Sequence, residues 1–158
     1  MPLTSLHYHF AGKAELGRAL IARYAERFND VLAGIDARLV DPRARLEAYA
    51  AIYTDLLQRG RFCLCGMLAA EYETLPTPMR DAVIEFFDRN EAWLTGVLEL
   101  GEEQGMLHVT GRPADLARMI ISGLEGAMLV TRPYGEVSRF ETATVQLLAS
   151  LVGSVPTE

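Results

Sequence analysis

The 158-residue sequence has few of the residues from which reactive sites are built. It contains two cysteines and three histidines. It has no His-Glu-x-x-His motif, no glycine-rich phosphate loop after a strand and no nucleophile elbow. Cys63 and Cys65 are spaced i, i+2 on an expected helix, so they point to different faces and predict neither a zinc clamp nor an intrachain disulfide. We therefore expect no catalytic residues, no metal, no cofactor and no enzyme activity. Redox sensing by the two thiols is the alternative to simple packing.

Signals for targeting or membrane insertion are also lacking. The first residues have no charged n-region, and no run of about 18 apolar residues occurs. The net charge of −6 gives no global positive field that would attract nucleic acid. Strand-like alternation, internal repeats and low-complexity tracts are missing too. These absences predict a cytoplasmic all-α protein with no membrane partner.

Apolar residues instead recur at helical spacing along nearly the whole sequence. From Lys13 to Leu39 they form one stripe with steps of three or four residues. About 25 residues at 1.5 Å each make a rod near 38 Å long. Asp41 can cap the next helix with Pro42 in its first position, and Thr77 with Pro78 offers the same signal. The expected helices are 13–38, 43–58, 63–73, 79–103, 114–131 and 136–152.

The stretch Met119–Val130 is apolar on nearly every side. Such a helix is buried on two sides, yet only one further helix follows it. Small residues along it would allow a neighbouring helix to come close. We therefore expect a homodimer through the last two helices. The expected interface residues are Met119, Ser122, Gly123, Gly126, Ala127, Val130, Phe140, Leu147, Leu148 and Leu151.

The segment Thr4–Leu16, TSLHYHFAGKAEL, carries the resemblance to a known family. It predicts a short helical turn, a break at Gly12 and a long helix from Lys13. Spacing alone fits the end of an amphipathic helix equally well. The residue order, however, closely resembles the end of the recognition helix and the start of the fourth helix in TetR-family transcriptional regulators, whose usual wording is close to LYYHF-x-x-K-x-x-L. The resemblance extends more loosely over the remaining chain.

This resemblance implies a TetR-like all-α fold, with a helix-turn-helix head that binds DNA and a body that dimerises and binds a small molecule. Residues 1–12 correspond to the end of the head and residues 13–158 to the body. The first two helices of the head, and the start of the third, are not represented, so we expect poor operator binding unless the head is complete. The implied DNA contacts are Thr4, Ser5, His7, Tyr8, His9 and Lys13, with Tyr8 and Lys13 on phosphates.

The resemblance also raises a ligand-pocket hypothesis. The helices between Arg43 and Thr131 are rich in aromatic and methionine side chains, which individually fit an ordinary core and together fit an apolar small-molecule site. Glu125 is the polar exception in its helix, and either a hydrogen bond or salt bridge to a nearby Tyr or Arg, or a ligand, can satisfy it. The candidate pocket residues are Tyr49, Tyr53, Met67, Phe86, Phe87, Trp93, Met119 and Met128.

The resulting hypothesis is a repressor that a small apolar molecule releases from its operator. The ligand would favour a dimer in which the two recognition helices are wrongly spaced. One alternative is a helical ligand-binding or dimerisation module that does not bind DNA, because the head is incomplete. A second alternative is a helical enzyme or cofactor carrier, which would require a polar cluster that the sequence does not reveal.

Overall fold

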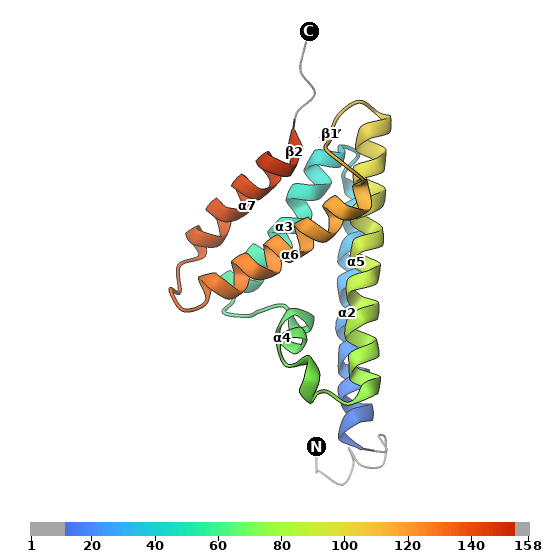
Figure 1. Cartoon of the computed structure of the whole chain (residues 1–158), viewed down its shortest axis with the longest axis vertical. Helices are drawn as coiled ribbons and strands as arrows, with labels where there is room; N and C mark the ends of the chain where they lie inside the picture. The colour runs from blue at the N-terminus through green and yellow to red at the C-terminus, as the bar shows by residue number, and fades with distance from the viewer. Residues whose placement is uncertain (1–11, 154–158) are drawn as a thin grey trace.

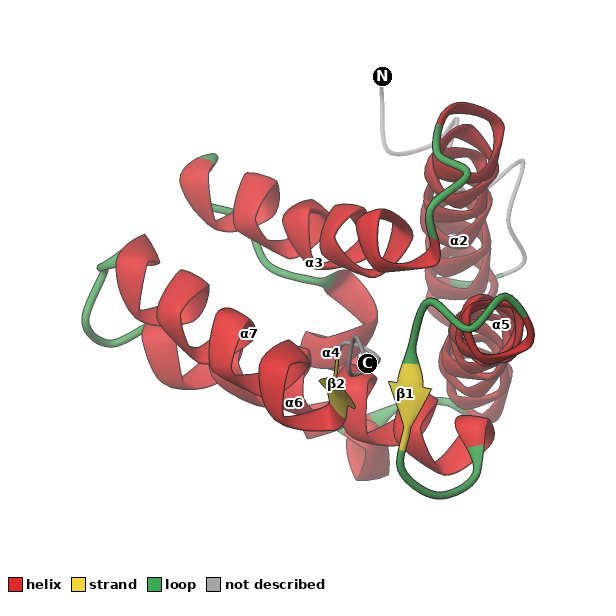
Figure 2. Cartoon of the chain, turned by 90° about the horizontal axis from the view of Figure 1, so that it is seen from above, coloured by secondary structure: helices red, strands yellow, loops and turns green. Residues whose placement is uncertain are grey.

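The computed structural model describes residues 12–153, which are mostly α-helical. Helices α2 and α5 run side by side as a long pair, and α3, α6 and α7 lie together on one side of it (Figure 1). The view from above shows the same pair nearly end-on and α4 beneath the other helices (Figure 2). The elements are α2 (Lys13–Arg38), α3 (Pro42–Gln58), α4 (Leu64–Ala70), the 3-10 helix η1 (Tyr72–Thr74), α5 (Thr77–Glu103), β1 (His108–Val109), α6 (Pro113–Thr131), α7 (Val137–Leu151) and β2 (Val152–Gly153).

The expected helix start at Asp41 is confirmed, whereas the one at Thr77 is displaced. Asp41 Oδ1 accepts the backbone N–H of Arg43 at 3.0 Å, and Pro42 is the first residue of α3. In α5, Pro76 takes the cap position and Thr77 is already helical, without a side-chain capping bond. Because Pro78 falls in the first turn, where backbone N–H groups have no intrahelical partner, its missing N–H has little consequence.

The single short helix expected over 63–73 is wrong, because the segment is divided into α4 and η1. Backbone carbonyls at this break accept side-chain donors. Thr74 Oγ1 donates to the carbonyl of Glu71 at 2.7 Å. Arg80 donates to the carbonyls of Leu75 and Glu73 at 2.8 and 2.6 Å. These bonds favour a tight turn before α5 over one continuous helix.

Two short strands also depart from the expectation that the chain has none. β1 and β2 pair antiparallel, with His108 opposite Gly153 and Val109 opposite Val152. Both valines are buried. The pair therefore joins the loop after α5 to the end of α7, and two residues per strand are too few to produce a visible alternation.

The core centres on aromatic side chains from three helices. Phe28 of α2 meets Phe86 of α5 edge-on, with ring centroids 5.1 Å apart and an interplanar angle of 79°. Tyr49 and Tyr53 of α3 also contact the Phe28 ring, with ring centroids 6.1 and 6.5 Å away. Edge-to-face pairs of this kind are favourable beyond their buried area. The cluster therefore fixes α3 against the α2–α5 pair.

Leu94, on α5, provides a test of this packing because its side chain is completely buried. Leu94→Ala should lower the free energy of unfolding by about 2–5 kcal/mol, through lost burial and the cavity left behind. Ile84→Ala on the same helix is the matched control, because Ile84 is 45% exposed. Urea denaturation measures both, and equal losses for the two variants would contradict the assigned face of α5.

Candidate functional site

A chain of hydrogen bonds crosses the apolar core. Tyr49 Oη donates to Asn90 Oδ1 at 2.9 Å, and Asn90 Nδ2 donates to the backbone carbonyl of Phe86 at 2.8 Å. Tyr49 Oη lies 3.3 Å from Tyr53 Oη, which in turn lies 3.3 Å from Oε1 of Glu125. Both tyrosines and Asn90 are almost completely buried. The chain thus connects α5, α3 and α6, with its tyrosines and Asn90 buried and Glu125 half-buried at its α6 end.

The number of protons in this chain depends on Glu125. Three links join Asn90, Tyr49, Tyr53 and Glu125, but the two phenols supply only two protons. With Glu125 ionised, one link therefore has no proton. In the structure Tyr53 Oη donates to Oε1 of Glu125 and Tyr49 Oη donates to Asn90, so the contact between the two phenols has no proton. If Oε1 is protonated and donates to Tyr53 instead, Tyr53 can donate to Tyr49 and every link is made. Completion of the chain thus favours the protonated carboxyl.

Burial acts on Glu125 in the same direction. Desolvation raises the pKa of the half-buried Glu125 carboxyl above its ordinary value, and hydrogen bonds from Cys63 and Tyr53 offset part of that rise. Burial, and to a lesser extent the neighbouring Glu125 carboxyl, also raise the pKa of the Cys63 thiol. Burial likewise raises the pKa of Cys65 to about 12, with a further contribution from Glu125. Both thiols therefore stay protonated and are poor nucleophiles at neutral pH.

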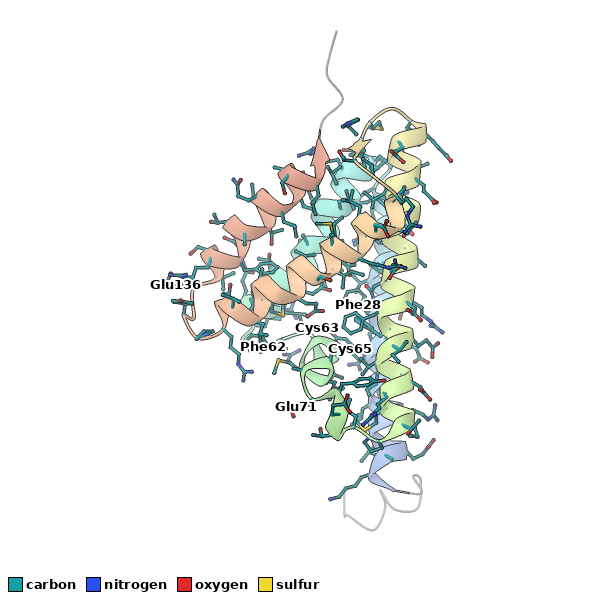
Figure 3. All side chains as sticks on the ribbon, viewed as in Figure 1. Phe28, Phe62, Cys63, Cys65, Glu71 and Glu136 are labelled. Carbon is teal, nitrogen blue, oxygen red and sulfur yellow. The ribbon has the colours of Figure 1, made fainter. Side chains whose placement is uncertain are left out.

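The two cysteines lie at the start of α4, inside the molecule where α4 approaches the α2–α5 pair (Figure 3). The Sγ of Cys63 accepts the backbone N–H of Gly66 at 3.5 Å and so caps α4. Cys65 belongs to the apolar core. Their positions support packing over redox sensing.

Glu125 also borders a hollow between α4, α5 and α6. The hollow has a volume of about 330 Å³, which is at the small end of the range for ligand sites. Glu125 lies directly against Gly66, where any Cβ would collide with its Oε2. The absence of a side chain at Gly66 is therefore what leaves room for the carboxyl. The lining residues are Gly66, Ala69, Phe87, Glu91, Arg118, Ile121, Ser122 and Glu125.

Two larger hollows lie along α2. One, of 460 Å³, runs between α2 and α5 and is bordered by several exposed charges, including Arg18, Asp81 and Glu85. The other, of 560 Å³, lies between α2 and α4 beside the exposed Leu20. Neither is lined by Tyr49, Tyr53, Asn90 or Glu125. The smaller hollow at Glu125 is therefore the candidate ligand site despite its size.

The predicted pocket residues are distributed over several environments. Phe87 is the one member of the predicted set among the lining residues of the hollow. Tyr49 and Tyr53 stand behind Glu125 in the hydrogen-bond chain. Trp93 stacks on Tyr49, with ring centroids 5.7 Å apart. Of the rest, Phe86 and Met128 are core residues, Met67 is half-buried, and Met119 is 53% exposed.

Sequence reasoning missed Gly66 as part of this site, and it gave a ligand as only one of the possible partners of Glu125. The hydrogen bond from Tyr53 bears out the expectation that a nearby Tyr or Arg satisfies Glu125. Asn90, a polar residue on an otherwise apolar stripe, was a usable signal of the buried chain. A glycine in a short helix gives no comparable signal.

The predicted dimer residues also fall into two groups. Met119, Ser122, Gly126 and Val130 are exposed and share one side of α6, and Val130 is 65% exposed. The other group contacts the protomer's own core. Phe140 is completely buried, and a Cβ on Gly123 would come within 2.5 Å of Leu147. Ala127, Leu148 and Leu151 are half-buried against the core.

The predicted DNA contacts lie mostly outside the described residues. Thr4, Ser5, His7, Tyr8 and His9 precede residue 12, where the description begins. Lys13 is exposed as the first residue of α2. The start of α2 and strand β2 lie at opposite ends of the structure (Figure 1).

Comparisons with known proteins agree with this architecture. Residues 42–147 match the family described as "Tetracyclin repressor-like, C-terminal domain". A crystal structure of a TetR-family transcriptional regulator from Agrobacterium tumefaciens has a TM-score of 0.92 and 30% identity to this chain, and the match covers 97% of this chain and 82% of that one. The chain belongs to the TetR family. The resemblance and the all-α fold expected from the sequence are thereby confirmed.

Two further relatives of this chain are described as a transcriptional regulator and a regulatory protein. The curated transcriptional regulator AcuR of Cereibacter sphaeroides is 33% identical over 137 residues, which are 82% of this chain and 61% of AcuR. The regulatory protein TetR from Rhodobacter sphaeroides is 27% identical with a TM-score of 0.84, and the match covers 93% of this chain and 80% of that one. This TetR-family chain therefore spans about three-fifths of the length of its curated relative. Across residues 12–153, no helix combines the length and apolarity needed to cross a bilayer.

The raised pKa of Glu125 predicts how stability depends on pH. Below 4.5, its ordinary pKa, Glu125 is protonated in the folded and unfolded chains alike, and its contribution to stability is fully present. As pH rises through the folded pKa the folded protein ionises too, and this contribution is lost. The free energy of unfolding of the wild type should therefore fall relative to Glu125→Gln as pH rises from 4.5 to neutrality. Urea unfolding at several pH values measures the difference. Glu99→Gln, at an exposed site on α5, is the control, and a pH-independent difference for Glu125→Gln would contradict the assignment.

Proposed function

We propose that this TetR-family chain belongs to a ligand-responsive, DNA-binding transcriptional regulator that acts as a repressor. Residues 1–12 are the end of the DNA-binding head, and residues 13–158 form the ligand-binding and dimerisation body. The hollow at Glu125 carries the proposal, because it is small, largely apolar and has a half-buried carboxyl at its wall. A small, mainly apolar molecule in this hollow would release the DNA.

Contacts between the hollow and α2 support such a response. Glu125 reaches Tyr53 and Tyr49 through the hydrogen-bond chain, and Tyr49 stacks on Trp93 with an interplanar angle of 21°. Trp93 Nε1 donates to Oδ2 of Asp36 on α2 at 2.9 Å. Residues in direct contact therefore link Glu125 to the C-terminal end of α2, and a rearrangement around Glu125 could be transmitted along them.

In this proposal α2 transmits the ligand-induced movement from the body to the head. This 26-residue helix begins at Lys13, beside the proposed head, and makes the hydrogen bond at Asp36 near its other end. Recognition helices of a dimer must lie about 34–36 Å apart to enter successive major grooves. A ligand that binds better to a body with another separation shifts the population away from the DNA-binding form by its difference in affinity.

We further propose that the regulator is a homodimer formed through α6 and α7. The exposed apolar surface on α6 supports this, because Met119, Leu129 and Val130 are all more than half exposed. On α7, Val145 is 63% exposed. The exposed members of the predicted interface would make the contact, and the buried Phe140 would support α7 from beneath.

A module that dimerises or binds a ligand without binding DNA is the alternative function. One observation favours it, since the matched family region, residues 42–147, is a C-terminal domain and lies outside the proposed head. The two functions share the hollow and the dimer but differ in operator binding.

The dimer is tested by Val130→Glu, which places a charge in the proposed contact. Because an unpaired charge is costly to bury, dissociation should increase at least about tenfold, equivalent to about 1.4 kcal/mol. Val40→Glu is the control, since Val40 is 82% exposed and lies between α2 and α3. Sedimentation equilibrium at micromolar concentration measures both variants. A monomeric wild type, or an unaffected Val130→Glu, would refute the interface.

Operator binding is tested by selection from a random DNA pool, followed by gel shifts with the selected sequence. The regulator should shift it selectively, with an affinity that falls as salt rises. Lys13→Ala should reduce the salt dependence by about one counterion per protomer if Lys13 contacts a phosphate. Arg38→Ala, at the other end of α2, should leave it unchanged. Failure to select any sequence, with the dimer intact, would favour the alternative module.

A further inference from the structure

The hydrogen-bond chain uses one carboxyl oxygen of Glu125 and leaves the other oxygen on the side of the hollow. Oε1 faces Tyr53, whereas Oε2 lies against Gly66, which lines the hollow together with Glu125. When the carboxyl is neutral and donates from Oε1, Oε2 is a carbonyl oxygen. When it is ionised, Oε2 is a carboxylate oxygen. Oε2 is therefore a hydrogen-bond acceptor when the carboxyl is ionised, and also when the carboxyl is neutral with its proton on Oε1.

The interaction with the Cys63 thiol leaves the Glu125 carboxyl with unused accepting positions. It is a hydrogen-bonding neighbour of the Glu125 carboxyl, but an sp² oxygen has two lone-pair positions. The carboxyl therefore retains accepting capacity after the protein's own donors are counted. Because a half-buried acceptor is costly to leave unpaired, a ligand that supplies a donor gains affinity there.

The remaining walls provide mainly apolar contact. Ala69, Phe87 and Ile121 offer side-chain carbon to an occupant. Arg118, the cation among the lining residues, forms ion pairs with Oε1 of Glu91 at 2.8 Å and Oδ1 of Asp115 at 3.3 Å. Its charge is already matched, so the hollow has no spare cation with which to hold an anionic ligand.

We propose that the hollow binds a small apolar molecule that carries a hydrogen-bond donor, an alcohol or an amine, whose O–H or N–H donates to Oε2 of Glu125. This inference rests on the proposed function, which assigns the hollow as the ligand site. It adds the polarity of the ligand, which must donate at one end and be apolar elsewhere. Carboxylates and purely apolar molecules are poor occupants by this criterion.

The test uses four ring compounds of similar size: benzyl alcohol, benzylamine, toluene and benzoate. Titrations of the full chain, followed by NMR shifts of residues lining the hollow, give their dissociation constants. The alcohol and the amine should bind about three- to tenfold more tightly than toluene, which is the range for one net hydrogen bond. Benzoate should bind most weakly.

Three variants separate the acceptor from general packing. Glu125→Met removes the acceptor and should abolish the advantage of the alcohol over toluene. Glu125→Gln should retain it, because an amide N–H can donate to Tyr53 as the neutral carboxyl does and leave its oxygen in the place of Oε2. Gly66→Ala should reduce the advantage, because its Cβ would displace Oε2. Circular dichroism confirms that each variant is folded.

Several outcomes would overturn the inference. They are equal binding of toluene and benzyl alcohol, tightest binding of benzoate, or an undiminished donor preference in Glu125→Met. If ligands of another class shift the lining residues while dimerisation and DNA binding hold, the proposed function stands and only the ligand class is wrong. If none of the four compounds binds in the hollow, both the proposed ligand class and the proposed pocket are wrong. The DNA-binding role is then still tested separately by the gel shift.

Discussion

The interior of this protein depends on hydrogen bonds between polar groups that are buried or half-buried. Asn90, Tyr49, Tyr53 and Glu125 come from three helices and lie beside or within an aromatic core. A buried donor or acceptor left unpaired costs about 1–3 kcal/mol. The core is therefore stable only while α3, α5 and α6 keep the relative positions that preserve these bonds. When the Glu125 carboxyl is protonated, its proton can complete the series, so the protonation of this half-buried group affects the hydrogen bonds of the buried ones.

The aromatic cluster extends this constraint to α2. Phe28 packs against the rings of Tyr49, Tyr53 and Phe86, two of which belong to residues of the hydrogen-bond chain. Close-packed interiors do not deform smoothly, so a shift at one wall is taken up by discrete rearrangements of neighbours. The same contacts that stabilise the body are thus the contacts through which an occupant of the hollow would act on the long helix.

The sequence was sufficient for the fold but only partly for the site. Helical periodicity located every long helix, and Asp41 with Pro42 marked the start of α3. Periodicity failed at Glu71, where side-chain donors divide the helix, and at β1 and β2, which are too short to show a pattern. These features depend on tertiary partners that no local window contains.

The site was harder to predict for a different reason. An apolar residue on a helical stripe is expected to be buried, but the stripe does not say whether it faces a neighbour or a hollow. Tyr49 and Phe86 therefore entered the pocket set, although they lie in the core. The same limit explains Phe140, an apolar residue assigned to the dimer surface that is completely buried in its own protomer. Glu125 was recognisable because a carboxyl in an apolar run needs a partner. Gly66 was not, because its role is to leave space for that carboxyl.

Helix α6 brings the two proposed surfaces together. Glu125 on one side borders the hollow, while Met119, Gly126 and Val130 lie on the exposed side of the same helix. Ser122 is exposed and also lines the hollow, so it stands where the two surfaces meet. A rotation or small translation of α6 that accommodates an occupant would therefore also move the proposed dimer contact. In such a dimer the ligand would need no long route to change the spacing of the two heads, because one rigid helix belongs to both sites.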